Sequence, residues 1–95
     1  MKNKIKTSIA IKKKLNKEFS PYLLEVDDVS EMHKGHKGYK EGQATHFAIK
    51  IKSEIFYGRK KVEIHRLINS VLTEEWENGV HSISINAEAW TLSNI

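Results

Sequence analysis

The 95-residue chain contains no cysteine, and this absence restricts its chemistry before any motif is considered. Without cysteine the chain forms no disulfide bonds and supplies no thiolate ligands, so it cannot build a zinc site of the zinc-finger type. Iron or another soft metal would need sulfur from a second molecule. The length fits one small core, so we expect a single domain over residues 1–95 with two packed layers.

Long apolar runs and catalytic signatures are also missing. No stretch of ~18 apolar residues would span a membrane, and the N-terminal lysines do not lead into a secretory signal, so we expect no membrane association and a cytoplasmic location. There is no nucleophile elbow, phosphate-binding glycine motif or zinc-hydrolase spacing, and the paired acids Glu74 and Glu75 fall on a stretch predicted to be a solvent-facing helix. The sequence therefore predicts a protein that is not an enzyme.

Positive charge is concentrated at one end of the chain. The net charge is +4, but residues 1–19 hold seven lysines against one acid. Such a segment can attract phosphate backbones, although charge runs of this kind are more typical of a solvated helix face.

Hydrophobic spacing predicts alternating helices and strands. The single proline, Pro21, ends a first amphipathic helix because the residue before proline is pushed out of the helical region. Phe47, Ile49 and Ile51 fall on one face and His46, Ala48, Lys50 and Lys52 on the other, which predicts the most secure strand. The expected order is helix 3–19, strand 23–29, strand 45–53, a helical turn at 53–58, a long helix 60–78, strand 80–85 and a short terminal helix at 87–90. This order predicts an α+β fold in which the first and long helices cover one face of a three-stranded sheet.

The long helix is expected to carry an apolar stripe that faces the core. The stripe consists of Val62, His65, Ile68, Leu72 and Trp76. His65 is therefore predicted to be a packed histidine at the edge of the core.

The other histidines gather mainly in "EMHKGHKGYKEGQATHF", residues 31–47. Three glycines and three lysines in this run favour a solvated loop over a metal site. His46 opens a strand, where we expect it on the exposed face. His81 follows Asn78-Gly79 at the start of the last strand, where a side chain can remain accessible while its backbone is fixed, but its position alone does not make it a ligand.

Four segments in this order resemble the BolA family over almost the whole chain: "LEVDDVSEMH", "THFAIKIKS", "FYGRKKVEIHRLINSVLTEE" and "GVHSISI". The resemblance implies a fold similar to the class II KH domain, with the order αββααβ(α) and a helix-turn-helix element, but without the glycine-rich nucleic-acid loop. It also implies partnership with a monothiol glutaredoxin in binding a 2Fe–2S cluster, and in some members transcriptional regulation. The apo form is expected to be a monomer or a weak homodimer.

The resemblance also suggests the cluster ligands. His81 matches the ligand histidine of the family's Val-His motif. A second ligand comes from the variable loop between the first two strands: ungapped counting selects His33, which we prefer, and the local Gly35-His36 pair offers His36 as the alternative. Cysteine and glutathione thiolates from the partner would complete the set.

A rival function is DNA binding by the turn before the long helix and by that helix, with the N-terminal lysines adding phosphate contacts. The candidate contacts are Arg59, Lys60, Lys61 and Arg66. Ile64 stands where the family commonly has arginine, so one positive charge is missing from this region. Val29 likewise replaces the acidic residue that is usual in the family's first-strand Asp-Glu-Ser pattern.

Overall fold

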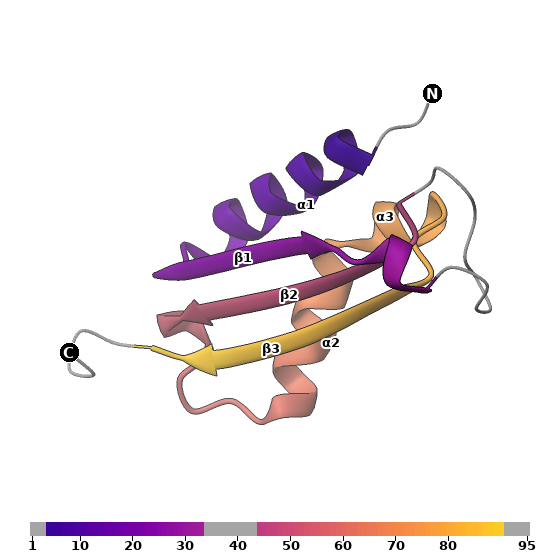
Figure 1. Ribbon diagram of the computed structural model, residues 1–95. Coiled ribbons are helices and arrows are strands. Elements are labelled where there is room, and N and C mark those ends of the chain that lie inside the picture. Colours follow the sequence, from indigo (N-terminus) through magenta and orange to yellow (C-terminus); the bar gives the residue numbers. More distant parts are fainter. Residues whose placement is uncertain (1–3, 34–43, 91–95) are drawn as a thin grey trace.

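The structure is a computed structural model that describes residues 4–33 and 44–90. Its elements are α1 (Lys4–Phe19), β1 (Leu23–Asp28), η1 (Ser30–His33), β2 (His46–Ser53), η2 (Glu54–Phe56), α2 (Lys61–Val71), α3 (Thr73–Glu77) and β3 (Ser82–Ala89). The strands form one sheet in the order β1-β2-β3, with β1 antiparallel and β3 parallel to β2 (Figure 1). The predicted α+β class and three-stranded sheet are confirmed, and the order αββααβ is compatible with a KH-like description.

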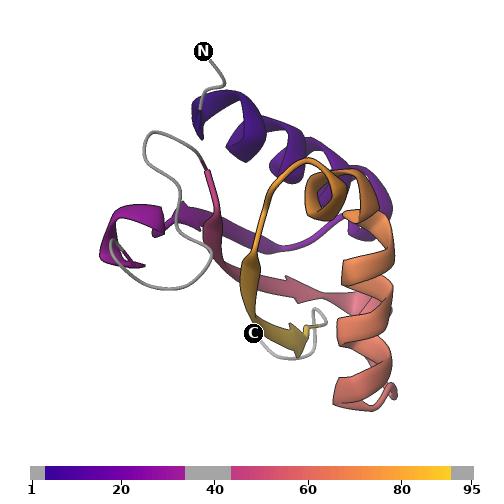
Figure 2. The same cartoon turned by 90° about the vertical axis from the view of Figure 1, so that its right-hand side faces the viewer.

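The helices lie on one face of the sheet, and the opposite face is open (Figures 1 and 2). Alternating residues of β2 point into the core because successive side chains of a strand face opposite sides. The core contains Ile11, Leu15 and Phe19 from α1, Phe47, Ile49 and Ile51 from β2, and Ile64, Ile68 and Leu72 from the α2 region. Among the described residues, no helix has the length and apolar character needed to cross a membrane.

Local hydrogen bonds and backbone angles set the end of α1 and the two ends of the turn that contains η2. α1 ends at Phe19, before Ser20 with φ 41° and Pro21, and the Ser53 hydroxyl donates a 2.6 Å hydrogen bond to the Phe19 carbonyl. The same hydroxyl accepts the Ile55 N–H at the start of η2, and Gly58 closes this turn with φ +77°. The predicted turn at 53–58 is therefore confirmed, and it positions the start of α2.

The predicted long helix is two helices. The chain leaves helical geometry at Leu72, with φ −102° and ψ 24°, so α3 takes a new direction. The buried stripe is centred on Ile64, Ile68 and Leu72, whereas Val62 is 52% exposed. The assignment of Val62 to the core face was therefore wrong.

The break at Leu72 is accompanied by the burial of an acidic side chain. Glu75 is only 6% exposed and both its carboxylate oxygens accept hydrogen bonds from the Lys14 ammonium of α1, at 3.0 and 2.8 Å. The expectation that Glu74 and Glu75 are both solvent-facing was wrong for Glu75, because Lys14 provides a cation that compensates its burial.

The predicted terminal helix at 87–90 is also wrong. β3 continues through this region, and its pairing with β2 extends to Ser53 opposite Ala89. The Trp90 N–H then donates to the Ser53 carbonyl at 3.2 Å. Hydrogen bonding to a neighbouring strand outweighs the helix preference of an Ala-Glu-Ala segment.

Candidate functional site

His81 lies immediately before β3, at the end of the sheet where β2 also begins. Its backbone N–H donates a 2.7 Å hydrogen bond to the Thr45 carbonyl, and the Ser82 N–H donates to the same oxygen at 3.1 Å. Val80, on its other side, is a core residue with 5% exposure. The His81 side chain itself is exposed. A fixed backbone thus presents an accessible imidazole.

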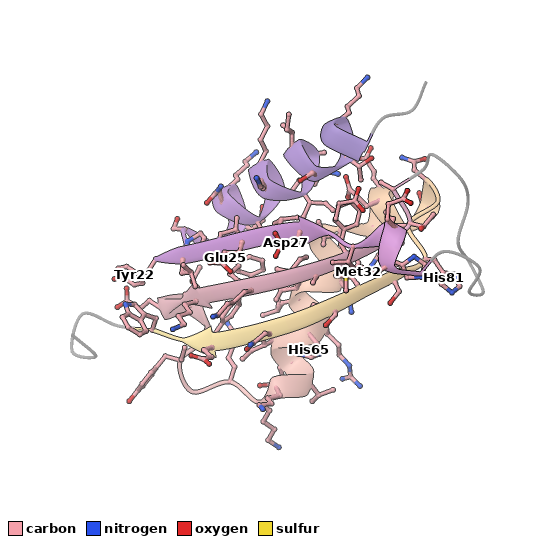
Figure 3. The ribbon with its side chains drawn as sticks, viewed as in Figure 1. Tyr22, Glu25, Asp27, Met32, His65 and His81 are labelled. Carbon is pink, nitrogen blue, oxygen red and sulfur yellow. The ribbon has the colours of Figure 1, made fainter. Side chains whose placement is uncertain are left out.

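Ser30 joins the loop side of this site to the sheet. Its buried hydroxyl accepts the N–H groups of Thr45 and His46 at 2.9 and 3.1 Å, and donates to an Asp28 carboxylate oxygen at 2.6 Å. In addition, the Val29 N–H donates to the His46 carbonyl. These bonds tie the start of η1 to the start of β2. The segments that flank residues 34–43 are therefore held at the end of the sheet that carries His81, and Figure 3 shows Met32 and His81 at that end.

His46 is a buried neighbour of His81. It is 4% exposed, so the possibility that it lies on the exposed face was wrong, and Nδ1 shares a 2.8 Å hydrogen bond with the Thr45 hydroxyl. The two imidazole ring centroids are 5.5 Å apart, with the rings tilted by 49°. Sequence reasoning missed this pairing because residues 35 positions apart become neighbours only through the parallel register of β2 and β3.

The remaining metal predictions cannot be compared with this geometry. His33 is the last residue of η1, but its side chain is outside the described part of the chain, and His36 lies outside the described residues. The choice between them stays a prediction. Within residues 4–33 and 44–90, no group of three or more histidine, cysteine, aspartate or glutamate residues could hold a metal ion.

The predicted histidine at the core edge, His65, lies on α2 and is half-buried. Figure 3 shows it on the helical side of the sheet, away from His81. His65 and His81 therefore belong to separate parts of the molecule.

Three of the predicted nucleic-acid residues, Arg59, Lys60 and Lys61, form a cationic turn at the opposite end of the sheet, and the fourth, Arg66, lies further along α2. Arg59, Lys60, Lys61 and Arg66 are all exposed. The Arg59 Nε donates to the Ile55 carbonyl at 3.0 Å, and the Lys60 N–H is capped by the Glu63 carboxylate at 2.9 Å. The turn follows the end of β2, whereas His81 precedes β3. Because β2 and β3 are parallel, the end of β2 and the start of β3 lie at opposite ends of the sheet. The eight residues of β3 span roughly 25 Å, so the two candidate sites are well separated.

Comparison with known proteins agrees with the sequence resemblance. The family model for BolA-like proteins matches residues 15–91. Among curated proteins, the chain is 43% identical over 77 residues to protein BOLA1, chloroplastic, from Arabidopsis thaliana. This match covers 79% of this chain and 48% of that relative, so the chain spans about half the length of the relative. It is 38% identical over 76 residues to the DNA-binding transcriptional regulator BolA from Vibrio cholerae, covering 80% of this chain and 68% of that protein.

A solved structure shows the same fold. The BolA domain of SufE1 from Arabidopsis thaliana superimposes with a TM-score of 0.79 and 40% sequence identity, covering 93% of this chain and 94% of that domain. Sequence and structure together establish that this chain belongs to the BolA-like protein family.

Proposed function

We propose that this chain is a non-catalytic adaptor that shares a 2Fe–2S cluster with a monothiol glutaredoxin, in iron–sulfur trafficking or iron sensing. His81 supplies one ligand and a histidine of the loop, His33 or His36, supplies a second. The observation that carries the proposal is the exposed imidazole of His81 on a backbone fixed by Thr45 and Val80. A ligand held in this way needs little ordering when it binds.

The donor set of the chain fits a shared cluster better than a cluster held alone. The chain offers imidazoles but no thiolate, and its described residues contain no three-ligand group. The thiolates must therefore come from the partner's cysteine and from glutathione. When bound, a cluster with imidazoles in place of two thiolates carries less negative charge, and by analogy with Rieske centres its reduction potential is higher.

The test is assembly of the shared cluster by purified proteins. Wild-type protein and variants are mixed with a monothiol glutaredoxin, iron, sulfide and glutathione, and visible absorption and circular dichroism are recorded. His81→Ala should leave the apo fold nearly intact and abolish the spectrum of the shared cluster, while the glutaredoxin keeps its own thiolate-held cluster. His33→Ala should change the spectrum more than His36→Ala.

His65→Ala provides a matched control, because it removes an imidazole from α2 rather than from the His81 end. This control should keep the shared spectrum. A His81→Ala mixture with the wild-type circular dichroism would contradict the proposal. A larger effect of His36→Ala than of His33→Ala would change only the choice of loop ligand.

A second candidate function is DNA-binding regulation. It is supported by the exposed cationic turn and by the similarity to the Vibrio cholerae relative, which is named a DNA-binding transcriptional regulator. The structure also offers a matched comparison, because Lys12, Lys13 and Lys17 are three exposed cations on a different element, α1.

Binding to duplex DNA at several salt concentrations tests this function. For a mainly electrostatic complex, log K falls by roughly 0.9 per phosphate contact for each log unit of salt. Replacing Arg59, Lys60 and Lys61 together with alanine should flatten this slope more than replacing Lys12, Lys13 and Lys17. If the variant of Arg59, Lys60 and Lys61 has the same salt slope as wild type, the turn is not part of the binding surface. The absence of binding at low salt would exclude this function.

A further inference from the structure

The cationic turn before α2 also carries apolar side chains that are open to water. Among the described residues, six large apolar side chains are exposed, and three of them fall between positions 55 and 62. Ile55 is 41%, Tyr57 is 73% and Val62 is 52% exposed. They flank the three exposed cations of the turn, Arg59, Lys60 and Lys61. Exposed apolar groups that gather beside charged groups mark interaction surfaces, whereas scattered ones need no explanation.

Hydrogen bonds and a buried anchor fix this turn, so its apolar side chains stay exposed in the complete fold. Phe56 is 1% exposed, and its ring centroid lies 5.1 Å from that of Phe19. The Tyr57 N–H donates to the Glu54 carbonyl, and the Arg59 N–H to the Phe56 carbonyl, both at 3.1 Å. In Figure 1 the segment between η2 and α2 lies at the lower edge of the molecule, below β3. The fold therefore presents these side chains at a protruding corner.

The charge of this corner favours an anionic partner that also offers apolar groups. Glu54 is exposed and the Glu63 carboxylate accepts the Lys60 N–H, so two acids accompany three cations and leave a small positive charge. The phosphate backbone of duplex DNA would satisfy the cations but offers no apolar contact to Ile55 and Tyr57. An anionic lipid bilayer offers both, because acidic headgroups attract Lys and Arg while tyrosine and aliphatic side chains enter the boundary with the acyl chains.

We propose that this turn is a contact site for an anionic membrane surface, with Tyr57 and Ile55 inserted at the headgroup boundary and the three cations on acidic headgroups. Such contact needs no membrane-spanning segment, so it agrees with the lack of a spanning helix among the described residues. It departs from the expectation of no membrane association, which rested on the absence of a spanning run and of a secretory signal. Because the turn and His81 lie at opposite ends of the sheet, the docked chain keeps its His81 end accessible.

Single-cysteine labelling tests the insertion, since the chain has no cysteine of its own. An environment-sensitive fluorophore is attached to Tyr57→Cys and, as the matched control, to Ile9→Cys. Ile9 is 47% exposed but lies on α1, which packs against β1 at the other edge of the sheet. Vesicles of phosphatidylcholine with phosphatidylserine should shift the emission of the label at position 57 to the blue and raise its intensity. The label at position 9, and vesicles of phosphatidylcholine alone, should give little change. An equal response of the two labels, or no response to the anionic vesicles, would overturn the proposal.

Cosedimentation of unlabelled protein with the anionic vesicles separates the two parts of the site. Each Lys or Arg near an anionic surface strengthens binding about fivefold, so replacing Arg59, Lys60 and Lys61 with alanine should weaken partitioning roughly a hundredfold. Ile55→Ser combined with Tyr57→Ser should weaken it about tenfold through lost apolar burial. Full vesicle binding by this double variant would leave a purely electrostatic surface and would overturn the proposal.

Duplex DNA is the competing occupant in the same experiment. The double variant of Ile55 and Tyr57 should bind duplex DNA as wild type does. If it loses DNA binding as strongly as vesicle binding, the apolar side chains do not select lipid and the proposal is overturned. If the double variant does not fold, the comparison of the two labelled positions decides. Because these experiments need neither iron nor glutaredoxin, they are independent of the proposed cluster function.

Discussion

Replacement of Lys14 by methionine should destabilise the fold, because it would leave the buried Glu75 carboxylate without its cation. Glu75 is 6% exposed and both its carboxylate oxygens accept hydrogen bonds from Lys14, whose side chain is 29% exposed. Breaking a fully buried ion pair costs about 3–5 kcal/mol, and an exposed pair about 0–1 kcal/mol. Since Lys14 is partly open to water, we expect a loss of about 2 kcal/mol. For a domain of this size, that corresponds to a fall in Tm of about 10 °C.

Two further variants distinguish this explanation from a general effect on packing. Glu74→Gln removes a 2.6 Å hydrogen bond to the same Lys14 ammonium, but the Glu74 side chain is 74% exposed, so its loss of stability should be much smaller than that of Lys14→Met. The double variant Lys14→Met with Glu75→Leu replaces the pair by apolar groups and should recover most of the lost stability. Thermal and urea denaturation at neutral pH measure all three. The reasoning is refuted if Lys14→Met is as stable as Glu74→Gln, or if the double variant is less stable than Lys14→Met.

Three other predictions concern stability. The Lys14 hydrogen bond lowers the pKa of Glu74 below its usual 4.5. The stabilisation of the fold by this interaction is therefore complete above pH 4.5 and is lost as pH falls through the lowered pKa. Urea denaturation at several acidic pH values should show that the stability of Lys14→Met depends less on acid than that of wild type. Ser30→Ala removes the acceptor of the Thr45 N–H and should cost about 1–3 kcal/mol, with an unchanged urea midpoint as the contrary result. His65→Ala should cost about 1 kcal/mol, because the side chain is half-buried, and thermal unfolding that shows no loss would indicate that it contributes no packing.

The regular elements were predictable because local patterns dominate them. The alternation of Phe47, Ile49 and Ile51 identified β2, and Pro21 identified the end of α1. His65 was predicted at the core edge and is half-buried. These features depend on periodicities that a short segment carries by itself.

The errors arose where distant residues decide the structure. Glu75 is buried because Lys14, 61 positions away, supplies a cation, and residues 87–89 are a strand because β2 pairs with them. The burial of His46 depends on Ser30 and on the parallel register with β3. No pattern within one segment reports such contacts, so the surroundings of His81 became visible only in the folded chain, whereas its candidacy as a ligand came from the family resemblance.

The most direct measurement of the central proposal is pulsed electron paramagnetic resonance of the reduced shared cluster. This chain is labelled with nitrogen-15 histidine, and the glutaredoxin is left unlabelled. Wild type should show strong nitrogen-15 coupling from imidazole bound to iron, His65→Ala should retain it, and His81→Ala should lose the shared cluster together with that coupling. A wild-type cluster without imidazole coupling, or a His81→Ala cluster with the full wild-type coupling, would contradict ligation by His81.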